Sequence, residues 1–382
     1  MSLVRSSAMD GGSAYRIHLI ERNVLTHLTR KVSRIAARIG CTWAPAVWFA
    51  AAAFAQNPPQ EFTVCPNGCQ PIVLSGGSQL IAEGGATANR ASLIAVDPAG
   101  DQLALPFLGG LPSGRAADGA PFGPVAYALD GRNLYIALGE ADGFHSGGPS
   151  LINRAAPTAL AGSVWQVTLS ADPTVSGPFV LRPADGQQVL AGQTVTVWDF
   201  SGNSATIQQI ANLGPGAQPS AVATLAGIPN RVYVVDSGTK RLLAIDGGTG
   251  EAVPVAQFPV KPESLRVYDD HQLLLTLFGA QPGTSSVWLL DPIAGASHLL
   301  AGNLDSAVDA IARGGTLFVL QNSTGPQGLG RLITVNAGGA IGSVLADGLN
   351  DPTTLAIDDF TGRLFFFSRG DGVIYDLPLA VR

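Results

Sequence analysis

The sequence predicts an all-β protein assembled from repeated four-stranded antiparallel sheets, and three observations lead to this prediction. Residues 219–259 contain four short apolar runs, VATLA, RVYVVD, RLLAID and VPVAQF, separated by Gly, Pro, Asn and Ser residues typical of turns. Related runs recur in the second half of the chain, at steps of 41, 44 and 47 residues. Finally, 13% charged residues with 47 Gly suit a turn-rich β protein rather than a disordered chain. We therefore expect a six-bladed β-propeller of four-stranded antiparallel blades.

The copies differ most at the two ends and in the first half of the chain. A step of 98 residues separates the second copy from the third, and it represents either one blade with large insertions or two blades. Seven blades is therefore the alternative count. The last copy, residues 353–378, has only three strands, whereas residues 61–64 (EFTV) precede the first complete copy. We expect this N-terminal strand to complete the last blade and close the ring, which removes unpaired strand edges.

Residues 1–55 differ from the rest of the chain. A basic region at residues 30–38 precedes an uncharged apolar run at 41–55, and the small residues before Gln56 fit a signal-peptidase site. These features predict a secretory signal with a long lead over residues 1–55 and a single propeller domain over residues 56–382, which would be secreted or periplasmic. Because the apolar run is short and no later run reaches the length of a membrane span, we expect no membrane span.

Removal of residues 1–55 takes away seven of the 22 basic residues and two of the 28 acidic residues, which changes the net charge from −6 to −11. Such a surface repels phosphate backbones, so nucleic acid is excluded as an expected partner. The two cysteines that remain, Cys65 and Cys69, flank a Pro-Asn-Gly turn. In an exported protein they predict a disulfide, with a redox pair as the alternative.

The longest departure from the repeat is the insertion at residues 139–162. It carries Asp142, His145, Asn153 and Arg154, whereas most of the chain offers Gly and Ala at comparable places. Long ordered loops in compact domains are usually functional. We therefore expect these four residues to form the rim of a ligand-binding site on one face of the propeller.

Three carboxylates, Glu263, Asp305 and Asp351, lie near the starts of predicted inner strands in three different blades. Carboxylate oxygens that converge on the central channel would suit a calcium ion, which needs six or more oxygen ligands. The alternative is that these residues cap turns or face water. No cofactor other than this Ca²⁺ ion is indicated.

Three tryptophans, Trp165, Trp198 and Trp288, occur in similar strand contexts. Large aromatic side chains at such positions are expected to pack between neighbouring blades. A role in stacking against carbohydrate requires that one ring be exposed.

The phrase VYVVDSGTKRLLAID resembles the core of an NHL repeat, with Asp236, Ser237 and Arg241 at its characteristic positions. Over residues 61–382 the plan resembles exported bacterial six-bladed propellers of the NHL and strictosidine-synthase-like superfamily. The insertion after NLYIALGEADG and the following GSVWQVTL are similar to the propellers encoded in scytonemin pigment clusters. The resemblance implies the fold, and for the gluconolactonase and paraoxonase enzymes of this superfamily it implies a bound calcium ion.

The sequence thus predicts a secreted, monomeric propeller. We expect it to act as a ligand-binding or accessory protein that holds a small molecule or a protein on one face, through its loops and channel mouth. The alternative is a calcium-dependent hydrolase or lactonase of the gluconolactonase–paraoxonase type. The residues leave open whether the protein is an enzyme.

Overall fold

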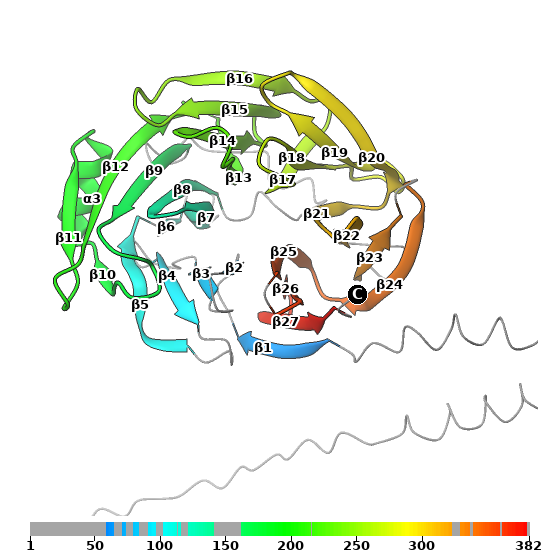
Figure 1. Cartoon of the computed structure of the whole chain (residues 1–382), viewed down its shortest axis with the longest axis horizontal. Helices are drawn as coiled ribbons and strands as arrows, with labels where there is room; N and C mark the ends of the chain where they lie inside the picture. Colours follow the sequence, from blue (N-terminus) through cyan, green and yellow to red (C-terminus); the bar gives the residue numbers. More distant parts are fainter. Residues whose placement is uncertain are drawn as a thin grey trace, which may run out of the picture. The chain divides into compact units, whose positions relative to one another are not determined.

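The strands of the computed structural model form six hydrogen-bonded sheets, counted over the residues that it describes (Figure 1). Those residues are 59–64, 71–73, 79–83, 91–96, 102–112, 114–115, 121–140, 162–214, 216–322, 329–336, 339–359 and 361–379. All of them belong to the unit Asn57–Arg382. The chain folds as an all-β propeller whose regular blades are four-stranded antiparallel sheets, as the sequence predicts.

Three sheets are simple meanders in which each strand pairs with the next. The first agrees with the four apolar runs of residues 219–259, and its strands are β13 (Pro219–Thr224), β14 (Arg231–Asp236), β15 (Arg241–Asp246) and β16 (Ala252–Gln257). The second consists of β17 (Lys261–Val267), β18 (Leu273–Phe278), β19 (Ser285–Asp291) and β20 (Ala296–Leu304). The third consists of β21 (Ala307–Arg313), β22 (Thr316–Gln321), β23 (Gly330–Val335) and β24 (Ile341–Leu349).

A fourth sheet joins the two ends of the described chain. Its last three strands in sequence are β25 (Pro352–Asp358), β26 (Arg363–Ser368) and β27 (Val373–Pro378). The first strand, β1 (Gln60–Val64), pairs antiparallel with β27 and forms the outer edge of this sheet. The strand order is β1-β27-β26-β25, so the N-terminal strand occupies the fourth position of a sheet otherwise built from C-terminal residues.

The remaining two sheets carry additional strands. One consists of β2 (Pro71–Val73), β3 (Gln79–Glu83), β4 (Ala91–Val96), β5 (Gln102–Leu111) and β10 (Phe179–Val180). The other consists of β6 (Gly114–Arg115), β7 (Pro121–Asp130), β8 (Asn133–Glu140), β9 (Ser163–Leu169), β12 (Ser204–Asn212) and β11 (Val195–Trp198). Because β12 pairs with β9, the 98-residue step contains one sheet with insertions rather than two sheets.

A short helix, α3 (Pro183–Leu190), lies in this insertion, where the sequence analysis expected irregular chain. Its first residue is a proline, whose missing N–H is no loss at a helix start. The Asp185 carboxylate accepts hydrogen bonds from the backbone N–H and the side chain of Arg182, which closes the first turn. None of the described helices is long and apolar enough to cross a membrane.

Neighbouring sheets contact each other through their inner strands in an unbroken sequence. Contacts join β2 with β25, β3 with β7, β7 with β13, β13 with β17, β17 with β21, and β21 with β25. The sheets therefore close into a ring, which Figure 1 shows with β7, β13, β17, β21 and β25 toward its centre. Side chains that project from the inner strands are consequently brought together even when they lie far apart in sequence.

A β-bulge recurs near the start of five inner strands, at the second residue of β13, β21 and β25, the third of β17 and the fifth of β7. The antiparallel register shifts across Val125, Ser220, Glu263, Val308 and Thr353, each of which has no partner residue on the adjacent strand. In four of these strands a proline comes directly before the bulge, at a place where a strand needs no backbone donor. Bulges bend a strand and re-aim side chains, so this repeated feature determines where the Glu263 side chain lies.

Candidate functional site

The predicted ligand-binding residues Asp142, His145, Asn153 and Arg154 lie outside the described residues, so their role stays a prediction. The strands that flank the insertion are described, and β8 pairs antiparallel with β9 from Leu138↔Ser163 onward. The insertion therefore leaves and re-enters the sheet at adjacent points. Cys65 and Cys69 also lie outside the described residues, and their predicted disulfide remains a prediction.

Two of the predicted calcium ligands are held by arginines in their own surroundings. The Asp305 Oδ1 atom accepts a hydrogen bond of 2.8 Å from the Gly283 N–H, and its Oδ2 atom lies 3.5 Å from Arg331. The Asp351 Oδ2 atom accepts a hydrogen bond of 2.6 Å from Arg369 Nε. Each carboxylate therefore holds a turn or a strand end beside a local positive charge, which agrees with the alternative that these residues cap turns.

Glu263, the third predicted ligand, is buried at the β17 bulge with only 1% of its side chain exposed. Its Oε2 atom lies 2.8 Å from Lys261 Nζ and forms an ion pair with it. Over the described part of the chain, no three His, Cys, Asp or Glu side chains lie close enough together to hold a metal ion. The predicted convergence of Glu263, Asp305 and Asp351 on one ion is therefore not found.

Burial is the main cause that raises the pKa of Glu263 to about 7 from the ordinary 4.5. The nearby Lys261 ammonium opposes this shift, and the negative charge of Asp309 adds to it. Between these two pH values the folded protein keeps a proton that the unfolded chain releases. The free energy of unfolding is therefore expected to fall as pH rises from about 4.5 to 7, and the loss is complete above the folded pKa.

Replacing Glu263 with glutamine is expected to remove this pH dependence. At pH 8 the E263Q variant should be more stable than wild type by up to roughly 3 kcal/mol, because no charge remains to be buried. At pH 4.5 the two proteins should be nearly equal. Urea denaturation at intervals between pH 4.5 and 8.5 measures the effect, with the exposed Glu251→Gln as the matched control. A difference between E263Q and wild type that does not change with pH would contradict this assignment.

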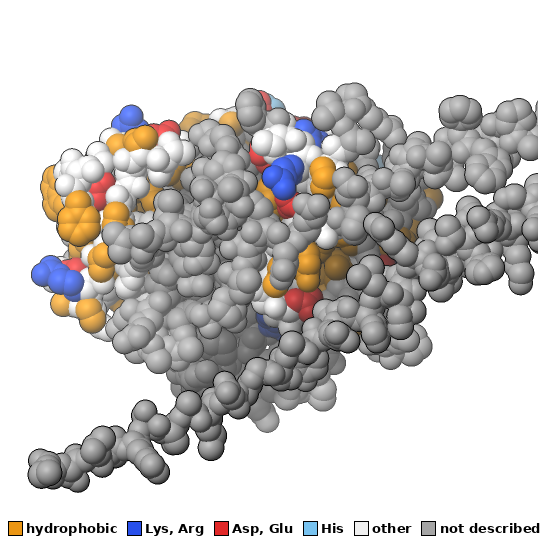
Figure 2. Space-filling model, turned by 90° about the horizontal axis from the view of Figure 1, so that it is seen from below, with side chains coloured by type: hydrophobic (Ala, Val, Ile, Leu, Met, Phe, Trp, Pro, Cys, Tyr) orange, Lys and Arg blue, Asp and Glu red, His pale blue; other side chains and the backbone are white. Residues whose placement is uncertain are grey.

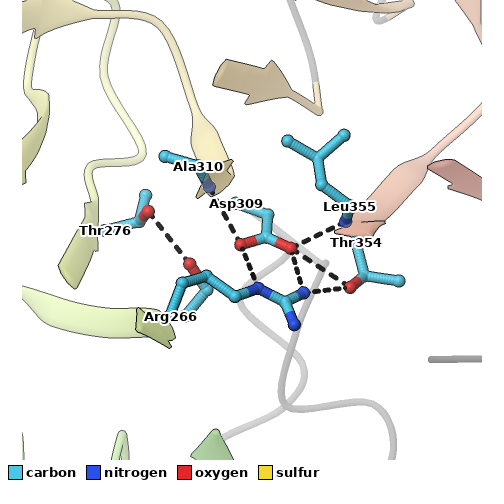
Figure 3. A network of polar contacts seen from close by, with 7 residues as sticks. Arg266, Thr276, Asp309, Ala310, Thr354 and Leu355 are labelled. Carbon is cyan, nitrogen blue, oxygen red and sulfur yellow. Dashed lines mark hydrogen bonds and ion pairs between the residues drawn. The ribbon is translucent and has the colours of Figure 1, made fainter. Parts of the chain in front are cut away.

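A second acidic residue, Asp309 on β21, lies at the centre of a buried network that joins three inner strands (Figure 3). Arg266 of β17 donates to both of its carboxylate oxygens, through Nε to Oδ1 at 3.1 Å and through Nη2 to Oδ2. The Thr354 hydroxyl of β25 accepts from Arg266 at 2.6 Å and donates to Asp309 at 3.1 Å. The backbone N–H groups of Leu355 and Ala310 complete the set, at 2.7 and 2.9 Å.

The opposite charges in this network neutralise each other. Asp309 is fully buried, and its negative charge is matched by the Arg266 guanidinium and by three further donors, the Thr354 hydroxyl and the backbone N–H groups of Leu355 and Ala310. A buried ion pair of this kind is stable only when its hydrogen bonds are complete. We therefore interpret Arg266, Asp309 and Thr354 as residues that hold β17, β21 and β25 together near the axis of the ring. The sequence analysis missed them, because nothing local marks their meeting.

A cavity of about 480 Å³ lies at the interface between the β13–β16 and β17–β20 sheets. Its walls come from β16, from the connection between β16 and β17, and from β18, β19 and the start of β20. The main apolar residues that line it are Val255, Phe258, Val260, Leu277, Trp288 and Leu290. Most of them belong to one hydrophobic cluster that spans both sheets. We call this space the Trp288 cavity.

A few polar groups interrupt the apolar wall of the Trp288 cavity. The indole Nε1–H of Trp288 donates a hydrogen bond of 2.9 Å to the Ser286 hydroxyl, and both residues line the cavity. Asp291 lines it as well, and its Oδ1 atom accepts the backbone N–H groups of Ile293 at 2.9 Å and Ala294 at 2.8 Å. The cavity thus combines a broad apolar surface with a small number of fixed polar groups, which is the usual composition of a small-molecule site.

The three tryptophans have different environments. Trp165 is fully buried, as the sequence predicts, and Trp288 is partly buried against the cluster between two sheets. The prediction is wrong for Trp198, which is 66% exposed. Phe200, 92% exposed, and Val180, 58% exposed, lie in or near the same β10–β11 region. Figure 2 shows hydrophobic side chains at the left of the view, the side on which β10, α3 and β11 lie in Figure 1.

The two exposed aromatic residues flank a hydrogen-bonded turn. Asp199, which lies between Trp198 and Phe200, is buried and accepts hydrogen bonds from the backbone N–H groups of Gly177, Ser201 and Asn203, at 2.8 to 2.9 Å. These bonds, together with a fourth from the Asn203 side chain, outweigh the effect of burial and hold the pKa of Asp199 below its ordinary value.

Comparison with known proteins yields similar solved structures only. No family model matches the sequence, and no curated protein matches it. A chain in the crystal structure of a nidogen–laminin complex is similar, with 12% identity and a TM-score of 0.47 over 76% of this chain and 86% of that one. The β-propeller domain of Cps50 (Swd1) from Myceliophteria thermophila is also similar, with 11% identity and a TM-score of 0.43 over 84% of this chain and 99% of that one. Identities this low carry no information about what the chain binds.

Proposed function

We propose that this protein is a binding protein that holds a small, largely apolar molecule in the Trp288 cavity. The observation that carries the proposal is the cavity itself. Its volume of about 480 Å³ lies within the range of roughly 300 to 1,000 Å³ typical of ligand pockets. Burial of a ligand against Phe258, Trp288 and Leu290 would gain roughly 25 cal/mol for each Å² of apolar surface removed from water.

The wider setting of this function is also proposed. If each sheet is one blade, the ring has six blades, in keeping with the resemblance to NHL-type exported propellers and the scytonemin-cluster group. We propose that residues 1–55 direct export to the periplasm or beyond and that the mature chain is a monomer. N-terminal sequencing of the exported protein tests the cleavage before Gln56. Binding of a small molecule or a protein on the loop face, through Asp142, His145, Asn153 and Arg154, is a second proposal, separate from the Trp288 cavity.

A binding role agrees better with the described carboxylates than the calcium-dependent hydrolase does. Asp305 and Asp351 are each held by an arginine and a turn. Glu263 is buried beside Lys261. A calcium ion would have to displace these three local cations before it gained its oxygen ligands, and that exchange costs the ion pairs already formed.

Filling the cavity tests the proposal. The probe is N-phenyl-1-naphthylamine, an uncharged dye whose fluorescence rises in apolar surroundings. We expect wild type to give a saturable rise. Replacing Ala296, which lines the cavity at the start of β20, with tryptophan should weaken binding of the dye by about tenfold or more, since the indole would occupy the space. Fluorescence titration measures both dissociation constants.

The matched control is Ala340→Trp. Ala340 is exposed and follows β23 at the turn into β24, as Ala296 follows β19 at the turn into β20, but it lies in a different sheet. This variant should bind the dye as wild type does. Equal affinity of A296W and wild type, with both proteins folded by thermal melting, would refute binding in the Trp288 cavity.

A further inference from the structure

The polar end of the Trp288 cavity is formed by a carboxylate in a fixed position. Asp291 accepts hydrogen bonds from the backbone N–H groups of Ile293 and Ala294, and both are made to the same oxygen, Oδ1. This turn holds the side chain in one orientation, since aspartate readily accepts N–H groups two and three residues further on. Among the described residues no hydrogen bond to the second oxygen, Oδ2, is found, and Asp291 is one of the residues that line the cavity.

A second polar group, Ser286, is available in the wall. Because the Ser286 oxygen already accepts the Trp288 indole N–H, the serine hydroxyl hydrogen is free to point toward a ligand acceptor. The cavity therefore offers an anionic acceptor at Asp291 and a neutral donor at Ser286. The two residues are five positions apart on β19, roughly 16 Å along a strand, so they would meet different parts of a ligand. A ligand hydroxyl at Asp291 can donate to its carboxylate, whereas a ligand carboxylate at the same place would be repelled.

We infer that the ligand of the Trp288 cavity is an uncharged molecule with an apolar body and a hydroxyl group that donates to Asp291, and that the site rejects molecules carrying a carboxylate. This inference rests on the proposed function, since it describes the same cavity. The inference adds which chemical group on a ligand the cavity selects. The apolar wall sets the affinity, and the fixed carboxylate sets the choice between alcohol and acid.

Two probes with the same ring system test this selectivity, namely 2-naphthalenemethanol and 2-naphthoate, each measured by displacement of N-phenyl-1-naphthylamine. Wild type should bind the alcohol about tenfold more tightly than the acid, or more, as expected for a charge-assisted hydrogen bond replaced by repulsion. In the Asp291→Asn variant the ratio should fall to about threefold or less. Asparagine keeps the Oδ1 acceptor for Ile293 and Ala294, so the turn is retained.

The neighbouring sheet supplies a matched control. Asp246 ends β15 as Asp291 ends β19, and its Oδ1 atom accepts the N–H groups of Gly248 at 3.0 Å and Thr249 at 2.8 Å. It does not line the cavity. Asp246→Asn removes the same charge from the same kind of turn and should leave the alcohol-to-acid ratio at the wild-type value.

The outcomes separate the two proposals. Equal binding of alcohol and acid by wild type, or an unchanged ratio in D291N, overturns the selectivity while binding in the cavity stands. If neither the dye nor either probe binds, or if A296W binds all three as wild type does, the proposed function fails and the selectivity with it. A ratio that changes equally in D291N and D246N also overturns the inference, because it would then reflect long-range charge.

Discussion

Replacing Asp309 with alanine is expected to lower the free energy of unfolding by about 3 to 5 kcal/mol. The carboxylate is fully buried and receives Arg266, the Thr354 hydroxyl and the Leu355 N–H from two other strands. The alanine variant leaves the Arg266 guanidinium, 17% exposed, without its counter-charge and leaves a buried backbone N–H without an acceptor. Urea denaturation at pH 7 measures the loss.

A double variant distinguishes the cost of leaving Arg266 without a counter-charge from the net contribution of the network to stability. Arg266→Met combined with Asp309→Leu removes both charges and fills the space with apolar atoms. Replacing both partners of a buried pair is often neutral, so we expect this variant to recover most of the stability that Asp309→Ala loses. A loss of less than about 1 kcal/mol in the alanine variant, the size of an ordinary surface effect, would show that the network does not hold the inner strands together.

Deleting Gln60–Val64 is expected to destabilise the protein far beyond the effect of five residues removed from a terminus. β1 pairs with β27 from Gln60↔Asp376 to Val64↔Val373, so the deletion exposes the edge of β27 and opens the sheet that joins the two chain ends. At roughly 1 kcal/mol for each ladder hydrogen bond, plus the surface exposed on β27, we expect a loss of several kcal/mol. Exposed strand edges also promote aggregation.

Thermal melting and light scattering of the deletion variant measure both effects. The control replaces the same five residues with alanine, which retains the backbone donors and acceptors of β1. The alanine variant should lie between wild type and the deletion. An unchanged melting temperature after deletion would mean that the β1–β27 pairing contributes nothing to the fold.

Local pattern was sufficient to identify the regular strands. The four apolar runs of residues 219–259 form β13–β16 in the order in which they occur, because each strand pairs with its sequence neighbour across a short turn. The place of residues 61–64 beside the last three strands also followed from counting strands per repeat, and β1 lies there. The helix α3 was missed, although a proline at its first position and Asp185 two residues later were signals for it.

The surroundings of the candidate site residues depend on the tertiary structure and could not be predicted from the sequence. Glu263 was singled out in the sequence for its place near the start of an inner strand, but it is buried at a bulge beside Lys261 and belongs to no group of three possible metal ligands among the described residues. The sequence analysis did not identify Asp309, which forms hydrogen bonds with Arg266, 43 residues earlier, and with Thr354, 45 residues later.

By itself, the sequence determined the strands, their grouping into four-stranded repeats and the propeller class, since these depend on side-chain periodicity and turn residues over spans of fewer than about 50 residues. The set of charged residues that meet near the axis, and the space that remains between two sheets, depend on how the ring closes and could not be predicted from the sequence. The Trp288 cavity illustrates the reason. Its walls come from residues 255–297 on strands of two sheets, and the volume left between two packed sheets depends on how all their side chains fit together, which no single strand records.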